Sequence, residues 1–86
     1  MPSKTVTVGS SVGLHARPAQ LIAQAAEELE AEVLIGLPGD EGVDASSSLM
    51  IMTLGAGPGD EVVVSSDDQA ALDTIAALVE KDLDAS

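Results

Sequence analysis

The sequence contains no cysteine and no aromatic residue, and it has only three basic residues, which are Lys4, Arg17 and Lys81. Without cysteine, the chain can form no disulfide, no thiolate zinc site and no thiol nucleophile. Nucleic-acid binding needs a basic surface and, for single strands, aromatic platforms for the bases, so this class is excluded. The 15 acidic residues give a net charge of −12, which an anionic membrane surface would repel.

Long apolar runs are also missing, and none approaches the length of a membrane-spanning helix. Residues 1–8 alternate in polarity instead of forming the apolar core of a signal peptide. We therefore expect a cytoplasmic protein, and the lack of cysteine agrees with a reducing compartment. Hydrophobic residues make up 45% of the chain, which excludes a disordered protein. With 86 residues, the chain is expected to form one domain, residues 1–86.

The polarity pattern predicts the element order β-α-β-β-α-β-α. Strands are expected at residues 4–8, 32–37, 42–45 and 61–65. Helices are expected at residues 16–29, at about 46–54 and after residue 66, where Ser66 and Gln69 match a capping box and the apolar face runs on to Leu83. The fold class is α+β, with a four-stranded, mostly antiparallel sheet that carries three helices on one face. The other face of the sheet is expected to be largely solvated.

His15 is the only side chain that titrates near neutral pH without perturbation. It lies where a loop meets the expected first helix, and a helix N-terminus presents unpaired N–H groups and a partial positive charge. Arg17 adds a fixed positive charge, and Pro18 fits the first helical turn. These parts suit a nucleophilic histidine that carries a phosphoryl group. The alternative is that His15 is only a helix cap or a surface residue.

Residues 13–19, Gly-Leu-His-Ala-Arg-Pro-Ala, resemble the active-site signature of HPr, the histidine-containing phosphocarrier family of the sugar phosphotransferase system. Residues 47–55 resemble the second helix of that family, and residues 59–62 also match. The resemblance covers nearly the whole chain and implies the open-faced β-sandwich of the family. It implies that enzyme I passes a phosphoryl group from phosphoenolpyruvate to this chain, which passes it to the IIA domain of a sugar permease. It further implies a carrier that needs no metal or cofactor and is not itself an enzyme.

The resemblance also assigns roles to single residues. His15 would carry the phosphoryl group on Nδ1, with Arg17 as its charged neighbour, and the backbone N–H groups of Ala16 and Arg17 would hold the phosphoryl oxygens. Family partners dock on the first two helices, and the matching positions here are Gln20, Gln24, Ser48, Leu49 and Met52. We expect Ile51 to lie in the core, while Leu49 and at least one methionine are exposed. A transient carrier of this kind is expected to be monomeric.

Some family members carry a regulatory serine that a dedicated kinase phosphorylates, and the resemblance places it at Ser47. Ser46 and Ser48 flank this position, so the assignment is open by one residue. Ser48 also stands where the family usually has a bulky aliphatic residue. The other interpretation is that the three serines only begin and cap a helix.

The first helix departs from many family members because it lacks their basic residues. Its polar side is formed by Gln20, Gln24, Glu27 and Glu28. Either steering by charge is weaker here, or the partners differ in charge. Val12, just before the signature, cannot form a side-chain hydrogen bond near the imidazole.

Two other classes of function remain to be weighed. A regulatory module could control a transcription factor or an enzyme according to its phosphorylation state. Such a module could dispense with the histidine, so the pair of His15 and Arg17 favours the carrier. A free-standing hydrolase has no support, since no second acid or base stands near His15 in the sequence and no P-loop occurs. The sequence leaves open which sugar, or whether a nitrogen-regulatory branch, is served.

Overall fold

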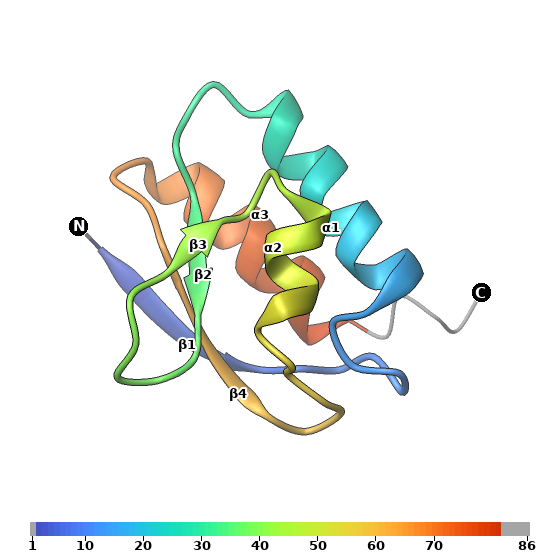
Figure 1. Cartoon of the computed structure of the whole chain (residues 1–86). Coiled ribbons are helices and arrows are strands. Elements are labelled where there is room, and N and C mark those ends of the chain that lie inside the picture. The colour runs from blue at the N-terminus through green and yellow to red at the C-terminus, as the bar shows by residue number, and fades with distance from the viewer. Residues whose placement is uncertain (1, 82–86) are drawn as a thin grey trace.

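The computed structural model describes residues 2–81, and its elements follow the predicted order β-α-β-β-α-β-α (Figure 1). The strands are β1 (Ser3–Thr7), β2 (Leu34–Gly36), β3 (Val43–Asp44) and β4 (Glu61–Ser65). The helices are α1 (Ala16–Glu28), α2 (Ser48–Thr53) and α3 (Gln69–Glu80). None of these helices of residues 2–81 is long and apolar enough to cross a lipid bilayer.

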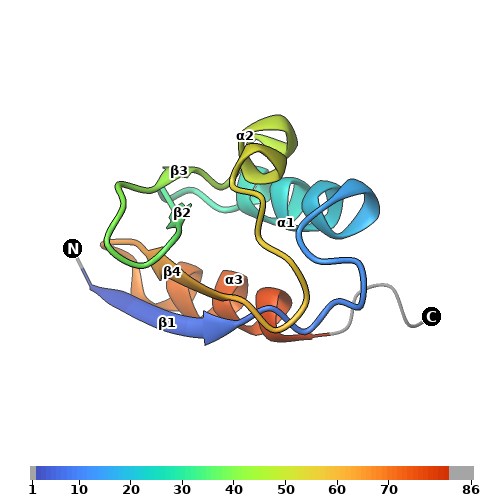
Figure 2. The same ribbon diagram turned by 60° about the horizontal axis from the view of Figure 1, so that its bottom comes forward.

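The strands form one four-stranded sheet in the order β1-β4-β2-β3, and every pair of neighbours is antiparallel. The registers place Val6 opposite Val62 and Ile35 opposite Val64, so these apolar side chains share one face of the sheet. The three helices lie on that face (Figures 1 and 2). This arrangement confirms the predicted fold class.

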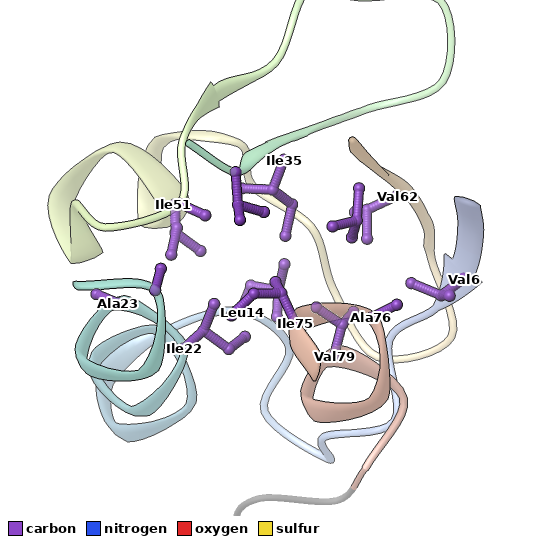
Figure 3. Close-up of a cluster of buried hydrophobic side chains, with 14 of the residues drawn as sticks. Val6, Leu14, Ile22, Ala23, Ile35, Ile51, Val62, Ile75, Ala76 and Val79 are labelled. Atoms are coloured by element: carbon purple, nitrogen blue, oxygen red, sulfur yellow. The ribbon is translucent and has the colours of Figure 1, made fainter. Parts of the chain in front are cut away.

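A cluster of aliphatic side chains fills the space between the sheet and the helices (Figure 3). Leu14, from the loop before α1, points into this cluster and is 1% exposed. Its labelled neighbours in the cluster include Ile22 from α1, Ile51 from α2 and Ile75 from α3. The segment that leads into α1 is therefore fixed by the core.

β2 is shorter than the predicted strand at residues 32–37 because the ends of that segment make other hydrogen bonds. The carbonyl of Glu32 accepts from the hydroxyl of Ser66 at 2.7 Å. The carbonyl of Leu37 accepts from the backbone N–H of Asp40 at 3.0 Å, which begins the turn to β3. These bonds remove both ends from the strand ladder.

The predicted cap of α3 is wrong. Asp68 is the N-cap residue, and its carboxylate accepts from the backbone N–H groups of Ala70 and Ala71 at 3.0 and 3.2 Å. Ser66 is fully buried, and its hydroxyl also accepts from the N–H of Asp68 at 3.2 Å. Ser66 thus bonds to the segments on either side instead of capping the helix. The predicted apolar position at Leu83 lies outside the described residues.

Candidate functional site

His15 is the N-cap residue of α1, and its side chain is exposed. Its backbone is extended, with φ −125° and ψ 161°, and its imidazole makes no capping hydrogen bond to the helix. The other two helices within residues 2–81 are capped by side chains: the hydroxyl of Ser47 accepts from Met50 N–H, and Asp68 caps α3. The first turn of α1 also holds no acidic residue. The imidazole is thus accessible, and it lies beside N–H groups that can bind an anion.

Ala16, the first residue of α1, has a φ of +48° and is the only non-glycine residue of the described part of the chain with a positive φ. An L-residue in this left-handed region costs roughly 1–2 kcal/mol. Such strain persists only where the surrounding structure holds the backbone in place. The strained bond directly follows His15, so the loop before it must be firmly anchored.

Two backbone hydrogen bonds and a close contact supply this anchor. The N–H of Leu14 donates to the carbonyl of Ala56 at 3.0 Å, and the N–H of Gly13 donates to the carbonyl of Ser10 at 3.1 Å. Gly13 has a φ of +75°, and a Cβ at this position would lie 2.5 Å from the carbonyl oxygen of Ala56. Only glycine fits there without displacing the loop. The contact between these loops holds His15 at its place.

Ala56 belongs to a turn, residues 55–60, that is fixed by its own hydrogen bonds. The carboxylate of Asp60 accepts from Gly57 N–H at 2.8 Å, and Asp60 N–H donates to the Gly57 carbonyl at 3.1 Å. Val8 bonds to the same turn, since its N–H donates to the Asp60 carbonyl at 2.8 Å. The glycines and Pro58 of this turn can be read in the sequence, but the contact of the turn with the loop before His15 cannot. Asp60 is therefore a supporting residue that the sequence interpretation missed.

Arg17 is the second residue of α1, and its side chain is exposed. Pro18 and Ala19, which follow it, are buried and seat the first turn on the core. The structure thus brings His15, Ala16 and Arg17 together at one helix end, as the sequence predicted. Within residues 2–81, no three acidic or histidine side chains stand together as metal ligands.

Large apolar side chains are exposed at three positions of the described chain: Val12 at 43%, Leu49 at 68% and Met50 at 42%. Leu49 and Met50 lie on α2, which packs beside α1 (Figure 2). Ile51, between Met50 and Met52 on the same helix, is fully buried. The predictions that Ile51 is core, and that Leu49 and one methionine are exposed, are confirmed.

The remaining residues predicted for docking differ in accessibility. Gln20 and Gln24 on α1 are exposed, whereas Ser48 is half-buried. Met52 is partly buried and packs against the core, while Met50, which was not among the predicted docking positions, is exposed. In a helix of six residues with one buried side chain, periodicity does not tell which methionine faces outward.

The three serines before and in α2 have different surroundings. Ser47 is the N-cap, and its hydroxyl accepts from Met50 N–H at 3.3 Å. Ser46 donates to the carboxylate of Asp44 through its hydroxyl at 2.7 Å and through its backbone N–H at 2.9 Å. These bonds lower the pKa of Asp44 below its usual value of 3.8, with the hydroxyl as the larger cause. Ser47 therefore caps α2.

Comparisons with known proteins match almost the whole chain. A family model described as "PTS HPr component phosphorylation site" matches residues 2–81. The phosphocarrier protein HPr of Streptomyces coelicolor is 39% identical, over 98% of this chain and 94% of that protein. The phosphocarrier protein NPr of Shewanella violacea is 37% identical, over 94% of this chain and 91% of that protein. The structure is similar to a crystal structure of HPr from Bacillus anthracis, with a TM-score of 0.83 and 34% identity, over 91% and 95% of the two chains.

Proposed function

Since the chain belongs to the HPr family of phosphocarrier proteins of the phosphotransferase system, we propose that His15 is the residue that carries its phosphoryl group. Enzyme I donates the group, which comes from phosphoenolpyruvate, and the IIA domain of a sugar permease accepts it. The protein is a carrier and not an enzyme in its own right. Residues 1–86 act as one domain, as a monomer, in the cytoplasm.

In the transfer step, the lone pair of His15 Nδ1 forms a bond to phosphorus. At the same time the bond between phosphorus and the donor group of enzyme I breaks, and its electron pair stays with that donor. The onward transfer to the IIA domain reverses these roles. One observation carries this proposal. The imidazole of His15, at the N-terminus of α1, is accessible and makes no capping hydrogen bond to the helix.

The groups beside His15 stabilise the phosphoryl oxygens. The backbone N–H groups of Ala16 and Arg17 donate to them, and the partial positive charge of the helix end attracts them. The Arg17 guanidinium adds charge-assisted hydrogen bonds. Because the loop 10–14 is anchored by Ala56, these donors need little reordering during the transfer.

A reconstituted relay tests this function. The chain is incubated with phosphoenolpyruvate, enzyme I and a IIA domain from the same organism, and the phosphorylated IIA domain is measured. We expect transfer with the natural chain, none with His15→Ala, and roughly ten- to hundredfold slower transfer with Arg17→Ala, which removes charge-assisted hydrogen bonds. Lys4→Ala, which removes another exposed cation, from β1, is the matched control. Equal rates for Arg17→Ala and Lys4→Ala would contradict the role of Arg17.

Partners dock on the face of α1 and α2, which we call the docking face and define by Gln20, Gln24, Ser48, Leu49, Met50 and Met52. The exposed Leu49 and Met50 support it, because exposed apolar side chains next to a functional group mark contact surfaces. Ser47 is the position for regulatory phosphorylation. Its place at the N-terminus of α2 supports this, because a helix start tolerates a phosphate.

The second candidate function is the regulatory module, and the similarity to an NPr protein favours keeping it beside the first. In that case the chain accepts the phosphoryl group on His15, but the readout is binding to a regulated protein. The same relay distinguishes the two functions. A chain that is phosphorylated by enzyme I and transfers nothing to the sugar-specific IIA domain would support the regulatory branch.

A further inference from the structure

We infer that the surface of enzyme I that contacts the docking face has an apolar centre and carries basic side chains opposite the C-terminus of α1. This inference rests on the proposed function, because it describes how enzyme I is recognised at the docking face. On this chain, the basic side chains meet four carboxylates, which we call the acidic end: Glu27, Glu28, Glu32 and Asp44.

The acidic end lies where the C-terminus of α1 meets the segment before α2. A hollow of about 280 Å³ is lined there by Glu27 from α1, Glu32 from the loop that follows α1, Asp44 from β3 and Ser46 from the segment before α2. The four carboxylate side chains of the acidic end are exposed. The hydrogen bonds from Ser46 lower the pKa of Asp44, which favours the ionised form of this carboxylate.

The three basic residues lie in other segments of the chain than the acidic end. The three basic residues are Lys4 in β1, Arg17 at the start of α1 and Lys81 directly after α3. Arg17 and Glu27 are ten residues apart on one helix, which is about 15 Å at 1.5 Å per residue. This distance exceeds the Debye length of about 8 Å at physiological ionic strength, so the two ends act as separate charges.

The α1 part of the docking face, Gln20 and Gln24, therefore lies between two charged groups. His15 and Arg17, which receive the phosphoryl group, stand at the N-terminus of α1, and the acidic end stands at its C-terminus. Leu49 and Met50 are exposed on α2, which packs beside α1. A partner with acidic side chains opposite Glu27 would be repelled both locally and by the net charge of −12. A partner with basic side chains there is attracted. The same contacts also fix the orientation in which its phosphoryl group faces His15.

The rate of phosphoryl transfer from phosphorylated enzyme I of the same organism, measured as kcat/KM at low and physiological salt, tests this inference. For the natural chain we expect kcat/KM to fall about three- to tenfold between about 0.01 M and 0.15 M ionic strength, because salt screens the attraction. Glu27→Lys should lower kcat/KM at low salt about three- to tenfold and flatten its salt dependence, and Glu27→Gln should have an intermediate effect.

Two further variants test whether the position and the sign of the introduced charge matter. Asp40→Lys makes the same change in net charge in the exposed turn between β2 and β3, away from α1 (Figure 1), and should change kcat/KM less than about twofold. Ser47→Asp keeps an oxygen at the N-cap of α2 and adds a negative charge beside the acidic end, so kcat/KM at low salt should rise about 1.5- to threefold.

The outcomes separate this inference from the proposed function. A kcat/KM that rises with salt, a Glu27→Lys variant that matches Asp40→Lys, or a Ser47→Asp variant that is slower than the natural chain overturns the basic partner surface while His15 remains the carrier. If enzyme I transfers nothing to the natural chain, the proposed function fails, and this inference fails with it. Circular dichroism of each variant confirms that the helices are retained.

Discussion

Asp44 and Ser46 are joined by two hydrogen bonds that select the ionised form of the carboxyl group. The pKa of Asp44 is lower in the folded chain than in the unfolded chain. This pair therefore stabilises the fold at pH values above the usual pKa of aspartate. The contribution is lost as the pH falls through the lowered pKa. In Ser46→Ala the hydroxyl bond is absent, so we expect the pKa of Asp44 to rise toward 3.8. A carbon-detected NMR titration of Asp44 measures this shift, and an unchanged pKa in the variant would contradict the assigned cause.

Single residues differ in how far the sequence alone identifies their role. The signature around His15 and Arg17 is local, so its position at a helix start could be predicted from seven consecutive residues, 13–19. The positive φ of Ala16 could not, because it depends on the contact of Gly13 with Ala56, which is 43 residues further along the chain. Contacts of this kind are set by tertiary packing and leave no local pattern.

Helix α2 combines one buried side chain, Ile51, with exposed Leu49 and Met50. Leu49→Asn keeps the charge and removes the apolar contact. It should slow transfer from enzyme I about tenfold or more, as for an apolar anchor at the centre of an interface. Since Leu49 is 68% exposed, the free energy of unfolding should change by no more than about 0.5 kcal/mol.

Ala77→Asn, at an exposed position of α3, is the matched control and should transfer at the natural rate. Stopped-flow transfer assays and urea unfolding measure the two quantities separately. A Leu49→Asn variant that transfers as fast as Ala77→Asn would show that α2 takes no part in docking.

The elements themselves were largely predictable, because α1 and α3 are long and periodic and the valines of β4 alternate between buried and half-buried positions. The predictions failed where two side chains compete for one role. Ser66 and Asp68 both suit an N-cap, and Asp68 takes it because the Ser66 hydroxyl bonds to Glu32 across the fold. The same bond also removes the first end of the predicted strand at residues 32–37 from the ladder of β2.

The sequence carries a net charge of −12, and the fold has a radius of gyration of 11.0 Å. This radius is close to the Debye length of about 10 Å at 0.1 M salt, so the carboxylates repel one another across the fold at low ionic strength. Added sodium chloride should therefore stabilise the protein and raise Tm by about 4–8 °C between about 0.01 M and 0.15 M, if the relieved repulsion is about 1 kcal/mol. Scanning calorimetry measures this shift, and a Tm that falls with added salt would contradict the repulsion.

The role of His15 is tested by the intact mass of the protein after incubation with phosphoenolpyruvate and enzyme I from the same organism, with His15→Ala beside it. We predict one added phosphoryl group on the natural chain, lost on mild acid treatment, and none on the variant. If the natural chain gains no mass while enzyme I phosphorylates itself, or if His15→Ala gains the same mass, His15 is not the phosphoryl carrier.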